Sequence, residues 1–301
     1  MTTSLSTTDA MAFVEYRIPR NGHTLFARDY LGADPAFVLM HGFPDNLRIY
    51  ERLASLLAGA GCRVIAFDFL GYGESDKPTD YPYSAQNMEV DLDAVVTALG
   101  PVRVIPVAHD ASGPTAINWS LDHQDRVAAL ALLNTYYDAA PTLRFPELIS
   151  LFADPAYREL AAAFIDDPTQ FAWLLAFQSR QFLRYASPAL REMMQKEFVP
   201  IVRAQFGATP NAALAFMALT RELHSAIDIN TRRIPELSGF RPPVGLIWGA
   251  GDSYLNTGVA KHLGSLFPNS RLTTLELGHW PQIDGPEEVA TSLLELSGAA
   301  S

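Results

Sequence analysis

The sequence predicts an α/β protein whose mostly parallel central sheet is flanked by helices and interrupted by a helical insertion. Short apolar runs alternate with longer helical patterns in both the first and the last part of the 301-residue chain. Between them, residues 138–237 show only helical periodicity. A chain of this length fits one large domain with an insertion.

The strands and helices of the alternating parts can be assigned in order. Residues 13–18 and 24–30 flank the turn-forming pair Asn21-Gly22 and predict a β-hairpin. Apolar runs that suit a parallel sheet covered on both faces follow at 36–40, 62–67, 102–107, 127–133, 244–248 and 271–275. Helical patterns fall at 47–60, 85–99, 114–122, 257–266 and 286–296.

The middle stretch predicts a separate structural unit. Its helical pattern is broken by Pro155, Pro168, Pro188 and Pro210 and contains no strand-like run. It lies between two predicted strands, so we expect a cap over the carboxyl edge of the sheet, where open α/β sheets bind ligands. The predicted organisation is a core of residues 1–137 and 238–301 with a helical cap of residues 138–237.

Composition and charge exclude several classes of partner. The net charge of −11, without any run of Lys and Arg longer than a pair, argues against nucleic acids and anionic membranes. Residues 1–10 lack the features of a secretory signal, and no run of about 18 apolar residues occurs, so we expect a cytoplasmic protein. The single cysteine, Cys62, opens an apolar run and is expected in a buried strand. A monomer and a homodimer both remain open.

The segment Ala108-His109-Asp110-Ala111-Ser112-Gly113 joins a predicted strand to a predicted helix and carries the clearest chemical signal. A nucleophile elbow requires small residues around the nucleophile because its strained turn leaves little room. That spacing fits when Asp110 is central. A centre at Ser112, as a serine esterase would need, places Asp110 and Pro114 at the small positions. We therefore expect Asp110 to be the nucleophile and Ser112 to be a packing residue.

This segment resembles the His-Asp elbow of epoxide hydrolases in the α/β-hydrolase superfamily, the aspartate-nucleophile branch to which haloalkane dehalogenases are related. Four more motifs agree in type and order over residues 14–296, which implies the α/β-hydrolase fold. They are His41-Gly42-Phe43-Pro44, the glycine-rich turn at 68–78, Gly249-Ala250-Gly251-Asp252 and Gly278-His279-Trp280.

The residue types suit a two-step hydrolysis. Asp110 would attack a tetrahedral carbon and form an alkyl ester. His279, oriented by Asp252, would then activate the water that hydrolyses this ester, and the backbone N–H groups of Phe43 and Ala111 would bind the oxyanion. We expect the adjacent helix start and these donors to lower the pKa of Asp110. No metal-ligand spacing is present, and we expect no cofactor.

The resemblance also implies tyrosines in the cap that donate a proton to the epoxide oxygen. Tyr157 lies about where one is expected, and it is our candidate donor. The position expected for a second holds no tyrosine, so Tyr136, Tyr137, Tyr185 and His224 remain alternatives. Tyr137 and Trp173 are candidate substrate contacts. The aromatic content of the cap suggests a small apolar or aromatic epoxide as substrate.

Two other functions compete with epoxide opening. A haloalkane dehalogenase would share Asp110 but would bind halide through side-chain N–H donors, and the places expected for them hold Ala111 and Phe43, with Trp173 as one substitute. A binding protein that keeps the fold without turnover would be expected to lack one of Asp110, Asp252 and His279. The sequence therefore favours an epoxide hydrolase that forms vicinal diols.

Overall fold

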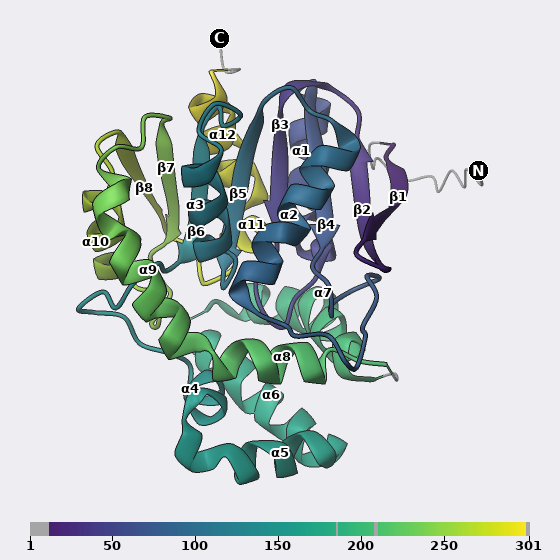
Figure 1. Ribbon diagram of the computed structural model, residues 1–301. Coiled ribbons are helices and arrows are strands. Elements are labelled where there is room, and N and C mark those ends of the chain that lie inside the picture. Colours follow the sequence, from purple (N-terminus) through teal and green to yellow (C-terminus); the bar gives the residue numbers. More distant parts are fainter. Residues whose placement is uncertain (1–11, 185, 208–209, 299–301) are drawn as a thin grey trace.

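The computed structural model describes residues 12–184, 186–207 and 210–298 and is built around one sheet (Figure 1). Its strands are β1 (Val14–Arg20), β2 (His23–Tyr30), β3 (Ala33–Met40), β4 (Cys62–Asp68), β5 (Val104–Asp110), β6 (Leu130–Thr135), β7 (Val244–Gly249) and β8 (Ser270–Leu275). Their order is β1-β2-β4-β3-β5-β6-β7-β8. The pairs β1·β2 and β2·β4 are antiparallel and the others are parallel. The predicted α/β class is confirmed.

The N-terminal hairpin forms as predicted. Asn21 and Gly22 both have positive φ angles, 47° and 85°, which a tight turn between twisted strands requires. Cys62 is buried at the start of β4, as expected for a strand residue in the sheet interior.

Helices cover both faces of the sheet because each face of the buried strands is apolar. One apolar layer packs under α2 (Ala85–Leu99), α3 (Gly113–Asp122) and α10 (Thr257–Ser265). The other packs under the short helix η1 (Leu47–Tyr50), α1 (Glu51–Gly59), α11 (Pro281–Asp284) and α12 (Pro286–Ser297). Trp119 and Trp248 are among the largest fully buried side chains of this core.

The segment between β6 and β7 is helical and lies across one edge of the sheet (Figure 1). We call the helices of this segment the inserted helices: α4 (Glu147–Ala153), η2 (Pro155–Tyr157), α5 (Arg158–Asp166), α6 (Pro168–Phe182), α7 (Pro188–Gly207), α8 (Ala213–Arg221) and α9 (Leu223–Leu237). Asp110, at the carboxyl end of β5, lines cavities together with side chains of these helices. The inserted helices therefore face the carboxyl edge of the sheet.

None of the helices in the described ranges is both long and apolar enough to cross a membrane.

A buried ion pair ties the first strand to the helix layer. Arg20 Nε of β1 lies 2.9 Å from Asp91 Oδ1 of α2, and both side chains are 3% exposed. The other carboxylate oxygen of Asp91 accepts a hydrogen bond from the backbone N–H of Leu70. Because both charges are removed from water, each depends on the other for compensation.

We predict that Arg20→Ala lowers the free energy of unfolding by about 3–5 kcal/mol, because it leaves the Asp91 carboxylate buried without its cation. Arg17→Ala is the matched control, since the side chain of Arg17 is 56% exposed and its pair with Glu74 is at the surface. That control should cost about 0–1 kcal/mol. Urea unfolding followed by tryptophan fluorescence measures both, and equal losses would contradict the prediction.

Candidate active site

Asp110 lies at the tip of a strained turn between β5 and α3. Its φ angle is 54°, in the left-handed region that non-glycine residues rarely occupy. The turn is possible only because its neighbours are small. A Cβ on Gly42 would lie 2.5 Å from the Asp110 Cβ, and one on Gly113 would lie 1.9 Å from Thr135 Oγ1. This geometry projects the Asp110 carboxylate away from the sheet and into the site.

Backbone and side-chain groups surround the two oxygens of this carboxylate differently. The backbone N–H of Phe43 donates to Oδ1 at 3.1 Å, and the backbone N–H of Ala111 also hydrogen-bonds the carboxylate. Oδ2 instead lies 3.6 Å from His279 Nε2. Both predicted backbone donors thus contact the carboxylate: the Phe43 N–H holds Oδ1, while Oδ2 lies beside the imidazole.

His279 is oriented by Asp252. Its Nδ1 lies 2.6 Å from Asp252 Oδ2, so Nδ1 carries the proton and Nε2 faces Asp110. Asp252 is itself fixed by the backbone N–H groups of Tyr254 and Leu255, which donate to Oδ1, and by Asn134 Nδ2, which donates to Oδ2. The structure therefore brings the predicted nucleophile, histidine and acid together in one row, in which His279 is hydrogen-bonded to Asp252 and lies 3.6 Å from Asp110.

The expected low pKa of Asp110 is wrong. Burial raises the pKa of this carboxyl above its ordinary value, although His279 and the backbone N–H groups of Phe43 and Ala111 act in the opposite direction. Burial alone would lower the pKa of His279, but Asp252 and Asp110 outweigh it and the net shift is upward. For Asp252, burial acts upward, yet His279 and its other hydrogen-bond donors hold the pKa below its usual value.

The neighbouring candidates for a nucleophile or base are already engaged. The Ser112 hydroxyl is fully buried and donates to the carbonyl oxygens of Met40 and His109. His41 and His109 are also fully buried, and burial lowers the pKa of both, to about 4 for His41. All three side chains pack behind Asp110, as the sequence predicted for Ser112, and Ser112 does not line either cavity at Asp110.

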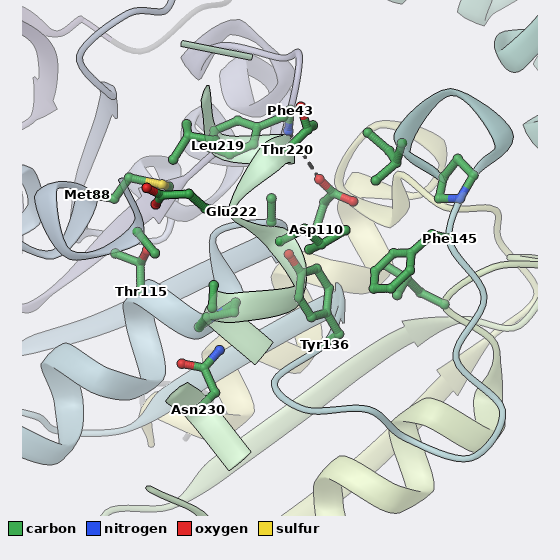
Figure 2. A pocket seen from close by; sticks show the side chains of 18 of the residues that line it. Phe43, Met88, Asp110, Thr115, Tyr136, Phe145, Leu219, Thr220, Glu222 and Asn230 are labelled. Atoms are coloured by element: carbon green, nitrogen blue, oxygen red, sulfur yellow. Dashed lines mark hydrogen bonds between the residues drawn. The ribbon is translucent and has the colours of Figure 1, made fainter. Parts of the chain in front are cut away.

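Two cavities meet at Asp110. The first, which we call the main cavity, is largely apolar and extends between α2, α3, α8 and α9 (Figure 2). The second lies between α6, α7 and the loop that carries His279. Both are lined by Phe43, Asp110 and His279. A substrate held on Asp110 would therefore have apolar walls on two sides.

The structure does not bring the predicted proton donor to the nucleophile. Tyr157 is 50% exposed at the end of η2 and lines neither cavity at Asp110, because that turn lies on the outer side of the inserted helices. Trp173 is likewise 59% exposed and stacks on Phe177 at the surface. Both assignments are corrected.

The remaining candidates for the proton donor and the substrate contacts lie in different places. Tyr137 is buried outside the main cavity, where its hydroxyl donates to Asn118 Oδ1, so its assignment as a substrate contact is also corrected. His224 is exposed, and Tyr185 lies outside the described residues. Among the three described alternatives, Tyr136 alone lines the main cavity, and Figure 2 shows its ring beside Asp110.

Two residues to which the sequence analysis gave no definite role lie at the end of β6 or directly after it. Asn134 holds Asp252, and Tyr136 faces the cavity. Their position in the sequence could have identified them, since side chains at the carboxyl end of a central parallel strand point toward the ligand site. The resemblance implies a proton donor in the cap instead, so Tyr136 was only one alternative among four.

Comparison with known proteins agrees with this geometry. The family described as alpha/beta hydrolase fold matches residues 35–286. Bifunctional epoxide hydrolase 2 of Sus scrofa is 27% identical over 293 residues, which are 88% of this chain and 52% of the pig protein, so the chain spans about half of that relative. Fluoroacetate dehalogenase of a Burkholderia species is 39% identical over 130 residues, 42% of this chain and 41% of that enzyme.

Among solved structures, haloalkane dehalogenase DatA from Agrobacterium tumefaciens C58 superposes with a TM-score of 0.77 at 23% sequence identity, covering 96% of this chain and 97% of that one. At this identity the likeness concerns the fold. The relatives include both epoxide hydrolases and dehalogenases, which share the family and differ in substrate. Together with the match over residues 35–286, these findings show that the chain belongs to the α/β hydrolase family.

Proposed function

We propose that this hydrolase opens small apolar epoxides to vicinal diols through an alkyl ester on Asp110. The observation that carries the proposal is the position of the Tyr136 hydroxyl, which lines the same cavity as the Asp110 carboxylate (Figure 2). Opening an epoxide requires a nucleophile on carbon and a proton donor for the departing oxygen, and these two side chains supply them from one place.

Tyr136 has the properties of a proton donor. Burial, with a contribution from the negative charge of Asp110, raises the pKa of its hydroxyl, so the phenol stays protonated at neutral pH. Its ring is held edge-on against Phe145, with the ring centroids 5.8 Å apart. Among the described residues no protein group hydrogen-bonds this hydroxyl, which leaves it free to donate to a substrate oxygen.

The two Asp110 oxygens take different parts in the proposed reaction. Oδ2 attacks the ring carbon, the carbon–oxygen bond breaks, and the oxygen takes the Tyr136 proton. Oδ1 becomes the carbonyl oxygen of the ester and already lies against the Phe43 N–H. His279 Nε2 then takes a proton from the water that attacks the ester carbon, and the Phe43 and Ala111 N–H groups stabilise the oxyanion. Collapse of the oxyanion breaks the ester bond, and the leaving alkoxide takes the proton back from His279 to give the diol. Asp110 then loses the proton left from water through His279, which restores the carboxylate.

Ester formation also prepares His279 for the second step. The negative charge of Asp110 contributes to the raised pKa of His279. When Asp110 becomes a neutral ester that contribution disappears, so the pKa of His279 falls and its neutral form, which can act as a base, is favoured.

The lining of the cavities supports a neutral, apolar substrate. In the part of the chain that the structure describes, no lysine or arginine lines either cavity at Asp110, and the main cavity carries the exposed carboxylate of Glu222. A haloacid such as fluoroacetate is an anion at neutral pH and would find no cationic partner there. An uncharged epoxide avoids this electrostatic cost.

A halide leaving group would lack suitable donors. The neutral side-chain N–H groups lining the two cavities belong to Gln178, Asn230 and Trp280. They donate to Tyr254 Oη, the Tyr137 carbonyl oxygen and Asp45 Oδ2 respectively. The single indole N–H of Trp280 is therefore already used, and only the second N–H of the Gln178 or Asn230 amide could bind a halide without breaking an existing hydrogen bond, whereas an epoxide oxygen needs only Tyr136.

We predict that His279→Gln treated with styrene oxide accumulates a covalent adduct on the peptide containing Asp110, because ester formation persists while its hydrolysis stops. Peptide mass spectrometry measures the adduct. The double variant with Asp110→Asn is the control and should carry none. An adduct on Ser112 would assign a serine esterase, and halide release from 1-bromobutane without diol formation from any epoxide would assign a dehalogenase.

We predict that Tyr136→Phe slows ester formation from styrene oxide by about 100-fold to 10,000-fold, the range usual for loss of a positioned acid. Tyr157→Phe removes the same hydroxyl from an exposed side chain and should leave the rate unchanged. Rapid-quench measurement of the adduct compares the two variants directly. A loss in Tyr157→Phe with none in Tyr136→Phe would reverse our assignment of the donor.

A further inference from the structure

A buried carboxyl group that the proposed reaction does not use lies behind the site. Asp45 is 2% exposed and follows the loop that carries Phe43. Its Oδ2 accepts a hydrogen bond from the indole Nε1 of Trp280, at 3.1 Å, and its Oδ1 has no hydrogen-bond partner among the described residues. A deeply buried carboxyl group with only one hydrogen-bonded oxygen lowers the stability of the fold, so its presence beside the site points to a function for its charge.

The backbone of Asp45 holds it rigidly in this place. Its N–H donates to the Gly42 carbonyl oxygen, at 3.2 Å, and its own carbonyl oxygen accepts from Gln205 Nε2 of α7, at 2.8 Å. Gln205 Oε1 in turn accepts from the backbone N–H of Gly73. One inserted helix thereby clamps two core loops and fixes the backbone from which the Asp45 side chain projects.

The electrostatic surroundings of Asp45 come almost entirely from the catalytic row. Burial raises its pKa to about 7; the charge of Asp110 adds to this rise, while the Trp280 N–H and His279 oppose it. The other titratable groups that sense it are the phenols of Tyr50 and Tyr72, which burial keeps neutral. No lysine or arginine of the described chain contributes. The charge of Asp45 therefore depends on the states of Asp110 and His279.

These two groups change during turnover. In the free enzyme Asp110 is negative and disfavours a second negative charge on Asp45. Once Asp110 is an ester that repulsion is gone, and His279 must become positive as it takes the proton from water. A carboxylate at Asp45 is then favoured by His279 and the Trp280 N–H, and only its burial still opposes the charge.

We propose that Asp45 is a second carboxylate of the site, protonated in the free enzyme and ionised in the ester state, where it stabilises the protonated His279 during ester hydrolysis. Asp45 touches neither substrate nor reacting atoms in this scheme, so it is a positioning residue that acts through His279. The inference rests on the Asp110 ester of the proposed function.

The protons balance over the cycle. Ester formation from an epoxide consumes one proton, which the alkoxide receives from Tyr136, and the ionisation of Asp45 releases one proton that restores the phenol. Ester hydrolysis releases one proton through His279, and Asp45 takes one up when Asp110 regains its charge. The pair Asp110 and Asp45 thus carries one negative charge in both states, which keeps the cost of burying charge nearly constant.

The test separates the two steps by rapid-quench mass spectrometry of the styrene oxide ester in wild type and Asp45→Asn. The amide can still accept from Trp280, so we expect an unchanged rate of ester formation. Ester hydrolysis should fall about tenfold at alkaline pH, equivalent to about one unit in the pKa of His279. The acid limb of its pH profile should also move to lower pH, because the Asp45 charge raises the pKa of His279.

A purely structural defect would slow hydrolysis without moving the acid limb, and that result would overturn the proposal. Trp280→Phe provides an independent variant if the first fails to fold. Removing the indole N–H takes away a group that lowers the pKa of Asp45, so Asp45 is less ionised and the acid limb should move to lower pH, in the same direction as with Asp45→Asn. An unmoved limb, or movement to higher pH, contradicts the inference.

Failure of this inference and failure of the proposed function give different results. The His279→Gln adduct on Asp110 reports the ester alone. If that adduct forms and the pH profiles of the two variants match that of the wild type, Asp45 has only a structural role. If no adduct forms with any epoxide or alkyl halide, the ester chemistry itself is wrong and the role of Asp45 falls with it.

Discussion

The whole site depends on one strained backbone turn. Asp110 holds a φ angle of 54° because the strand before it and the helix after it are both fixed in the core and the space around the turn is closely filled. Gly42 and Gly113 provide room where any Cβ would collide with Asp110 or Thr135. The strain is compensated by packing elsewhere, and it gives the carboxylate an orientation that an unstrained strand end would not.

From this point the electrostatics follow. A carboxyl group forced out of water has a raised pKa, and here the backbone N–H groups and His279 oppose that rise and favour the ionised form. His279 is in turn kept protonatable by Asp252, whose own charge is secured by Asn134 and two backbone donors. Each group sets the protonation state of the next, so a change at Asp110 is transmitted along the row.

The inserted helices line the cavities at Asp110 and fix two loops of the core. They enclose the two cavities at Asp110 with mostly apolar side chains, which excludes water from the substrate and favours uncharged ligands. Gln205 also joins α7 to the loops that carry Asp45 and Gly73. The loop that holds the oxyanion donor Phe43 is therefore braced from above by an inserted helix and from below by the sheet.

The sequence by itself determined the α/β class, the order of strands and helices, the hairpin, and the identity of Asp110, Asp252 and His279 as the residues that meet. The fold elements and Asp110 follow from local rules: period, turn chemistry and the small residues an elbow requires. Asp252 and His279 were expected from motifs that resemble those of a known family. The tertiary structure decided two other matters. Tyr136 rather than Tyr157 faces Asp110, because the inserted helices pack so that η2 points outward. No local sequence pattern encodes that packing. The pKa of Asp110 rises because its direction depends on how completely distant segments exclude water from the carboxylate, and a linear pattern carries no record of that burial.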